Sequence, residues 1–402
     1  MHLGLSAILK FFSDHRRDDA LVLGTVIATE GSTYRKPGAM LLIARDSSHR
    51  GLISGGCLEA DLAAQASDVF ADGQPRKVVY DMSEGDDFAF GLGLGCDGII
   101  HLLLQRIDRK DGFGFLETLE RALAAKTSGL LSLVTASTDE GFQVGDFALD
   151  CGNGLAKGKA ELMSSLLASE VSGFSGGHDM SRRYWHDSLK TAEGEVDLLL
   201  VPIMPPPALL ICGAGPDSVP VARLAVEMGW NCTIVDHRPG FARADRFPGN
   251  CRVKVMQPSE LCQHIDLESL DAAVLMTHHL GHDRSYLAQV IEASLTYIGL
   301  LGPRARRDRL LGEIDAADAR VYGPAGLDIG AELPESIALA IIAEIHACLN
   351  GRDGHMLTPG GAGTRTTRGT PESVARFRRP GRETEWDSEL NGVNIECCPV
   401  WS

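Results

Sequence analysis

The sequence lacks any apolar run near the length of about 20 residues that a membrane-spanning helix needs. Its first residues, MHLGLSAILKFF, hold only a short apolar run, which meets the charged DHRRDD with no small-residue cleavage site, so we expect no signal peptide. The ten cysteines are irregularly spaced without a C-x-x-C pattern, which argues against a zinc ribbon and favours free thiols. These absences predict a cytoplasmic protein.

Positive charge is also scarce. The 38 Lys and Arg residues stand against 54 Asp and Glu, giving a formal net charge of -16. Such a chain repels nucleic acid and anionic membranes unless it has a local basic patch, so protein or small-molecule partners are favoured. Hydrophobic residues at 44% and charged residues at 23% are close to the averages of soluble globular proteins, so most of the chain should fold.

A glycine-rich turn is the first motif that indicates binding. Gly213 and Gly215 follow the short apolar run ALLIC and precede a helical pattern, and Asp236 ends the next strand-like run. In dinucleotide-binding folds such glycines let a phosphate approach the helix start, and the acidic residue accepts from ribose. Ser218 replaces the third glycine, and Asp217 could simply complement the helix dipole, so a purely structural turn is the alternative.

The order strand, helix, strand predicts a parallel sheet covered by helices over residues 208–356. Residues 202–207, which are rich in proline, are expected to be a stiff linker. We expect an α/β protein: an α+β domain over residues 1–201, then a Rossmann-like domain, then a tail over residues 357–402 without a packed core.

Two cysteines lie beside glycines in the first domain. Cys57 follows Gly55 and Gly56 at an expected helix start, where amide donors and the helix dipole favour the thiolate that binds metals. Cys96 lies in the similar stretch GLGLGCDG. The alternative is that these glycines only make turns and both thiols are buried.

Arg35 lies in a cationic loop, GSTYRKPG, between two expected paired strands. Hydroxyl groups and two cations suit a bound phosphate, although an exposed hairpin turn has the same composition. Together with the two thiols, this loop suggests an anionic ligand with a soft metal. We expect the thiol loops and the Gly213 turn to face one common cleft.

His278, His279, His282 and Asp283 follow a later strand-like run. Two histidines four residues apart could bind zinc, but Gly281 interrupts the pattern and no further ligand is evident. A loop that lines the crevice of the parallel sheet is the better interpretation.

Several long motifs in order resemble the XdhC/CoxI family: GTVIATEGSTYRKPGAMLL, SGGCLE and GLGLGC in the first domain, then LLICGAGPDSVPVARLA, VDHRP, THHLGHD and YIGLLGPRARRDRL. The resemblance covers most of residues 21–106 and 196–350, whereas residues 108–195 carry little that is familiar. It implies a factor that binds the molybdenum cofactor, supports its sulfuration by a cysteine desulfurase and passes it to an apo xanthine dehydrogenase or related hydroxylase.

The resemblance also implies roles for single residues. Cys57 and Cys96 would contact the cofactor or its metal, with the neighbouring glycines and Arg35. Gly213, Gly215 and Asp236 would serve its phosphate or nucleotide-like part, with His278 in the same crevice. A nucleotide is a further candidate ligand, and a homodimer is compatible with the family.

Two other functions remain open from the sequence. An NAD-dependent oxidoreductase would use the Gly213 turn, with His278 and Arg304 in catalytic roles. A nucleotide or redox sensor would respond to a ligand without chemistry. The cofactor chaperone accounts for more of the motifs than either alternative.

Overall fold

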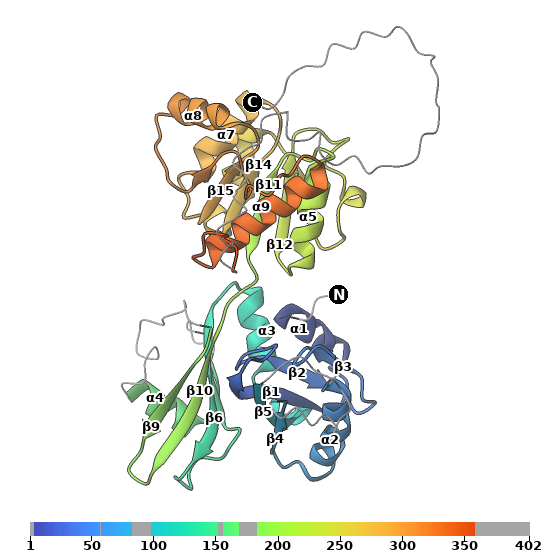
Figure 1. Cartoon of the computed structure of the whole chain (residues 1–402), viewed down its shortest axis with the longest axis vertical. Coiled ribbons are helices and arrows are strands. Elements are labelled where there is room, and N and C mark those ends of the chain that lie inside the picture. The colour runs from blue at the N-terminus through green and yellow to red at the C-terminus, as the bar shows by residue number, and fades with distance from the viewer. Residues whose placement is uncertain (1–3, 57, 83–97, 152–155, 169–182, 358–402) are drawn as a thin grey trace, which may run out of the picture.

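The computed structural model describes residues 4–56, 58–82, 98–151, 156–168 and 183–357. These residues form two lobes joined by one crossing of the chain (Figure 1). The lobe toward the N-terminus holds two antiparallel sheets, and the other lobe holds one parallel sheet. The protein is therefore mixed α/β, with α+β architecture before residue 204.

Sheet A has five strands in the order β3-β2-β1-β5-β4. Its β1 is apolar and buried on both faces, because α2 covers one face while α1, α3 and the second sheet cover the other. The elements are α1 (Leu5–Asp14), β1 (Ala20–Gly31), β2 (Met40–Ile43), β3 (His49–Gly51), α2 (Glu59–Asp72), β4 (Arg76–Asp81), β5 (Gly98–Asp108) and α3 (Leu116–Ala124). The expected pairing of the strands on either side of the cationic loop is confirmed.

Sheet B has the order β8-β7-β6-β10-β9 and packs its inner face on sheet A. Its elements are β6 (Gly129–Ser137), β7 (Phe147–Asp150), β8 (Ala156–Gly158), α4 (Ala160–Ala168), β9 (Trp185–Lys190) and β10 (Glu195–Ile203). Besides this shared core, hydrogen bonds join the two sheets among the described residues: His186 Nε2 lies 2.8 Å from the Ile27 carbonyl oxygen, and Gln105 donates to the Gly145 carbonyl over 2.7 Å.

The linker is shorter than residues 202–207, because β10 continues to Ile203. Pro202 lies within this strand, opposite Leu130 of β6. The strand tolerates proline there because its pairing with β9 ends at Leu200, so Pro202 lies where β10 is an edge strand and needs no second ladder bond. Only residues 204–207 separate β10 from the parallel sheet.

Sheet C is parallel, with the order β13-β12-β11-β14-β15-β16. Helices α5 and α9 cover one face, and α6, α7 and α8 cover the other. The elements are β11 (Ala208–Cys212), α5 (Ser218–Glu227), β12 (Asn231–Asp236), β13 (Arg252–Val255), α6 (Leu261–His264), β14 (Ala272–Leu275), α7 (Leu280–Val290), β15 (Tyr297–Leu300), α8 (Arg304–Glu313), β16 (Val321–Tyr322) and α9 (Pro334–Leu349). The expected parallel sheet covered by helices is confirmed.

The two lobes meet at the edge of sheet C where its strands begin. Lys126, just after α3, donates from Nζ to the Ser269 carbonyl oxygen over 3.0 Å. Gly229, in the turn before β12, comes so close to α1 that an added Cβ would lie 3.9 Å from Ser6 Oγ. The opposite edge, where the strands end, therefore points away from the first lobe.

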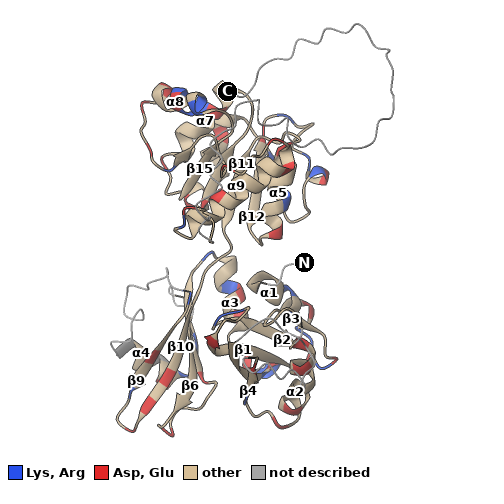
Figure 2. Cartoon of the chain, viewed as in Figure 1, with Lys and Arg blue, Asp and Glu red and all other residues tan. Residues whose placement is uncertain are grey.

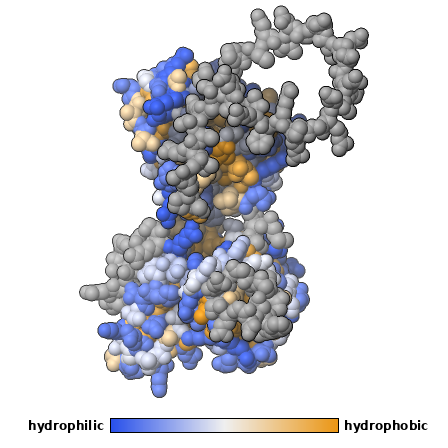
Figure 3. Space-filling view, viewed as in Figure 1, coloured by the Kyte–Doolittle hydropathy of each residue, from blue (hydrophilic) through white to orange (hydrophobic). Residues whose placement is uncertain are grey.

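Acidic and basic residues are interspersed along the ribbon of both lobes (Figure 2). Apolar surface appears on the sheet C lobe (Figure 3), where α9 and the loop before it expose Ile329, Leu333 and Leu339. Among the described residues, no helix has the length and apolar character that crossing a bilayer requires.

Candidate cofactor-binding site

The Gly213 turn lies at the end of β11, at the point where the strand order reverses between β11 and β14. Gly213 has a φ of +116°, and an added Cβ would lie 2.6 Å from the Met276 carbonyl oxygen. Only glycine fits this close approach of two strand ends. Ser218, in place of a third glycine, is buried and donates from Oγ to the Gly215 carbonyl over 2.7 Å. Ser218, which replaces the third glycine of the dinucleotide-binding pattern, therefore stabilises the turn.

Asp236 supports this turn from β12. Its Oδ2 accepts from the Ala214 amide over 2.8 Å and from Arg238 Nη2 over 2.7 Å, while Oδ1 accepts from the Arg238 amide and Nε. Burial opposes ionisation of Asp236, but the hydrogen bonds from Arg238 and Ala214 outweigh it and lower the pKa to about 2. Because the side chain is 2% exposed and internally bonded, a ribose would have to displace Arg238 to reach it.

The loop after β14 faces the Gly213 turn across the switch point. His278 Nε2 lies 2.7 Å from Asp217 Oδ2, which joins the two loops. Behind it, the buried carboxylate of Asp283 accepts from Thr277 Oγ1 over 2.6 Å and from Arg306 Nη2 over 2.7 Å. We call this place, between Gly213, Asp217 and His278, the carboxyl-edge crevice, because α/β sheets bind ligands in a crevice at this position.

Three imidazole rings cluster beside this crevice, one pair edge to face and the other tilted. The His237 and His282 ring centres are 4.4 Å apart, and those of His279 and His282 are 4.1 Å apart. Burial and the neighbouring His279 and His237 lower the pKa of His282. Its Nδ1 is buried without a hydrogen-bond partner among the described residues. No group of three or more His, Cys, Asp or Glu side chains in the described part could hold a metal ion.

One end of sheet A gathers the ends of three strands and the beginnings of two. The register pairs Gly31 with Gly98, Leu41 with Gly51, and Asp81 with Ile99. Since β1, β3 and β4 end there while β2 and β5 begin there, residues 32–39 join β1 to β2 at this end, and residues 52–56 lead from β3 toward α2. We call it the loop end of sheet A.

A buried carboxylate fixes the loop before α2. Glu59 Oε1 accepts from the amides of Ile53 and Ser54, each over 2.8 Å, and Oε2 accepts from Ser54 Oγ over 2.7 Å. Burial opposes ionisation of Glu59, but these hydrogen bonds outweigh it and lower the pKa. Gly55 and Gly56 face open space, since an added Cβ at either would contact nothing within 4 Å. Cys57 and Cys96 lie outside the described residues.

The cationic loop borders a cavity of about 490 Å³, lined by Arg35, Lys36 and Arg183 as well as the exposed Tyr34. Lys36 Nζ lies 3.3 Å from Thr33 Oγ1. Arg183, just before β9, supplies a third cation that the loop sequence alone does not indicate. The backbone at Gly98 packs on this loop so closely that an added Cβ would lie 2.5 Å from the Ser32 carbonyl oxygen.

The predicted site residues therefore form two groups. Arg35, Gly55 and Gly56 belong to the first lobe, whereas Gly213, Gly215, Asp236 and His278 lie at the edge of sheet C that points away from it. The five residues of β11 put about 16 Å between its two ends. The described residues of one chain do not form the single common cleft that the sequence predicts. The reason is that the lobes meet at the edge of sheet C where its strands begin, which we call the amino edge.

Comparison with known proteins agrees with this two-lobed arrangement. The sequence model of the XdhC Rossmann domain family matches residues 209–345. The sequence model of the XdhC and CoxI family matches residues 15–81. A Bacillus subtilis (strain 168) protein, named as a probable subunit of xanthine dehydrogenase, is 32% identical over 338 residues, which is 81% of this chain and 92% of that protein. The chain belongs to the XdhC and CoxI family.

Two further relatives of this XdhC-type chain are informative. The Escherichia coli (strain K12) "Molybdenum cofactor insertion chaperone PaoD" is 23% identical over 336 residues, 81% of this chain and 82% of that protein. A crystal structure of a xanthine dehydrogenase from Bacillus halodurans superposes with a TM-score of 0.69 and 30% identity over 86% of this chain and 97% of that one. Residue 57 lies within a matched family segment, whereas residue 96 and all of sheet B lie outside both.

Proposed function

We propose that this chain is a molybdenum cofactor chaperone that delivers its cargo to a xanthine dehydrogenase-type hydroxylase. Family membership and the relative named as a molybdenum cofactor insertion chaperone support the role. One observation assigns this role to particular residues. The glycine-rich segment before α2 and the cationic Arg35 loop both lie at the loop end of sheet A.

The residues present fit a pterin phosphate that carries a soft metal. Arg35, Lys36 and Arg183 supply cations for a phosphate, and Gly55 and Gly56 leave their backbone open to an approaching ligand. Cys57 and Cys96 are the proposed soft ligands. Two thiols rather than a complete metal cage suit a carrier that must release its cargo.

The carboxyl-edge crevice is proposed to hold an anionic group, of the cofactor or of a nucleotide. Gly213 and Gly215 shape the backbone there, and His278 stands at its rim beside Asp217. Asp236 is then a positioning residue, because it fixes Arg238 and the Ala214 amide rather than offering a free acceptor. This geometry gives no support to an NAD-dependent dehydrogenase that uses Asp236 for ribose.

The direct test loads purified protein with molybdenum cofactor and measures bound molybdenum after gel filtration. Cys57→Ala and Arg35→Gln should each lower the bound fraction at least fivefold. Cys262→Ala, which removes an exposed thiol of the other lobe, is the matched control and should leave it unchanged. Equal loading of Cys57→Ala and the control would remove the proposed thiol role.

Sulfuration and the choice of client are finer parts of the same proposal. Adding loaded chaperone to an apo-hydroxylase should restore its activity, and a cysteine desulfurase in the mixture should raise that activity further. No dependence on the desulfurase would restrict the function to insertion.

A further inference from the structure

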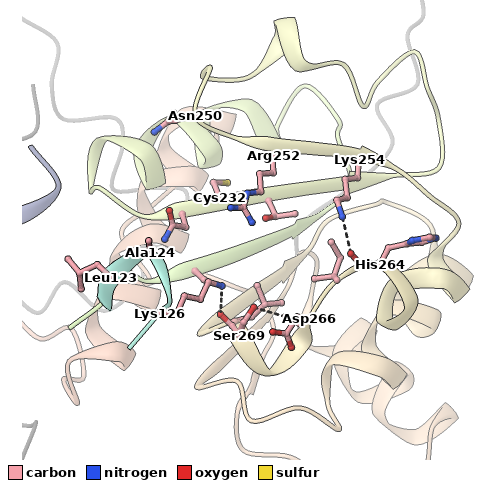
Figure 4. Close-up of a pocket in the computed structure, with 15 residues that line it drawn as sticks. Leu123, Ala124, Lys126, Cys232, Asn250, Arg252, Lys254, His264, Asp266 and Ser269 are labelled. Atoms are coloured by element: carbon pink, nitrogen blue, oxygen red, sulfur yellow. Dashed lines mark hydrogen bonds between the residues drawn. The ribbon is translucent and has the colours of Figure 1, made fainter. Parts of the chain in front are cut away.

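A separate cavity lies between the two lobes, at the amino edge of sheet C (Figure 4). Its volume is about 500 Å³, and its walls come from the end of α3, the beginnings of β11, β12 and β13, and residues 264–270 before β14. Because Gly213 and His278 stand at the other edge of the sheet, this cavity is distinct from the carboxyl-edge crevice. We call it the interlobe cavity.

Cations dominate the charge of the interlobe cavity. Lys126, Arg252 and Lys254 line it, with His264 beside them and Asp266 as the acidic lining residue. With His264 neutral, three positive charges face one negative charge, although the chain as a whole carries -16. Like charges gathered around one space repel one another, and a bound anion relieves that repulsion.

Two of these cations are held in place by the backbone. Lys126 Nζ donates to the Ser269 carbonyl over 3.0 Å, and Lys254 Nζ donates to the His264 carbonyl over 2.9 Å, as the dashed lines in Figure 4 show. An ammonium group has three donors, so each lysine keeps donors for a ligand. Arg252 and Lys254 are two residues apart on β13 and therefore project to the same face.

Protection of the edge strand β13 against pairing would account for Arg252 and Lys254 alone, because charged side chains are common on such edges. It does not account for Lys126, which comes from the other lobe and bonds across 143 residues of sequence. The shared feature of the three cations is the cavity that they border.

The remaining walls indicate the rest of the ligand. Leu123, Ala124, Ile265 and Leu270 give the cavity apolar surface, and Asn231, Asn250 and Thr233 add polar groups. A volume of this size accommodates a small organic molecule. We propose that the interlobe cavity binds a phosphorylated small molecule of nucleoside phosphate type, with its phosphates on Lys126, Arg252 and Lys254 and its ring on the apolar wall. Binding would then link the two lobes.

The test titrates the full-length protein calorimetrically with ADP and, separately, with pyrophosphate. ADP should bind with a measurable Kd that weakens as salt is raised. Lys126→Gln and Arg252→Gln/Lys254→Gln should each weaken ADP binding at least tenfold. Lys157→Gln/Lys190→Gln, which removes two exposed cations from sheet B, is the charge-matched control and should change the Kd less than twofold.

Circular dichroism and the melting temperature of each variant show that it is folded. Absence of ADP binding to the wild type, or an unchanged Kd in folded Lys126→Gln, would overturn the proposal. Binding that Arg238→Gln abolishes and Arg252→Gln/Lys254→Gln spares would place the ligand at the carboxyl-edge crevice and also overturn it. Pyrophosphate binding as tight as that of ADP would refute the role of the apolar wall. None of these outcomes depends on molybdenum cofactor loading.

Discussion

At the scale of single residues, the site is built from carboxylates that hold backbone rather than ligand. Asp236 bonds to the Gly213 turn and to Arg238, and Glu59 bonds to the loop before α2. The sequence identified Asp236 but assigned it to ribose, because a motif gives position and not hydrogen-bond partners. Glu59 was missed as a structural anchor, although a carboxylate that begins a helix after SGGCL is the available signal.

The Asp236 ion pair predicts a pH dependence of stability. Since folding lowers the pKa of Asp236 from its usual 3.8 to about 2, its contribution is present above pH 4 and is lost as the pH falls toward 2. This contribution amounts to about 2 kcal/mol at neutral pH. Arg238→Gln removes the main group that lowers the pKa while burial still raises it, so acid unfolding should begin at higher pH.

The measurement is the urea midpoint of wild type and Arg238→Gln between pH 2 and pH 7. The control is Arg243→Gln, which breaks an exposed ion pair with Asp245 in the same lobe. Parallel pH profiles for wild type and Arg238→Gln would show that the pair does not stabilise the fold.

At the scale of elements, strands made of apolar runs beside glycine-rich turns were predictable, and the strands of sheet B were not. The strands around the cationic loop and the Gly213 turn with α5 follow clear apolar patterns and turn residues. Sheet B was not identified, because its outer strands alternate with charged residues and one of them, β8, has three residues. The predicted linker begins at Pro202, but β10 continues to Ile203. The sequence does not show where the pairing of β10 with β9 ends, and so it does not show that a proline fits in this strand.

The packing of the cationic loop on sheet B yields a prediction. Gly38 has a φ of +88°, and an added Cβ would lie 2.9 Å from Val201 Cγ1. Gly38→Ala should therefore cost about 3 kcal/mol of unfolding free energy, from backbone strain plus overpacking. In a Val201→Ala background only the strain remains, and the added cost should fall to about 1–2 kcal/mol.

Urea unfolding of the wild type, both single variants and the double variant completes this cycle. Gly55→Ala is the control, because Gly55 has no positive φ and no atom near an added Cβ. Costs that add to within about 0.5 kcal/mol would contradict the contact.

At the scale of the whole molecule, the two lobes have separate cores. Within the described residues, three hydrophobic clusters draw only on residues up to Ile203, and two draw only on residues from Ala208 onward. The hydrogen bond from Lys126 to Ser269 crosses between them and contributes about 1 kcal/mol. We therefore propose that residue 204 begins an independently folding domain.

Residues 204–357, expressed alone, should unfold cooperatively with a melting temperature within about 5 °C of the corresponding transition in the full chain. The expectation follows from the fact that sheet C has helices on both faces without the first lobe. Near-ultraviolet circular dichroism and thermal melts provide the measurement. A fragment that lacks fixed aromatic signals and a sharp transition would show that the lobes fold as one unit.

The docking of the first lobe on the strand beginnings of sheet C has a consequence for delivery. The strand endings, with His278 at their rim, are left as an outward face of the molecule. If the chain serves a hydroxylase as proposed, that large enzyme can contact this face while the lobes stay joined, so contact there requires no hinge motion.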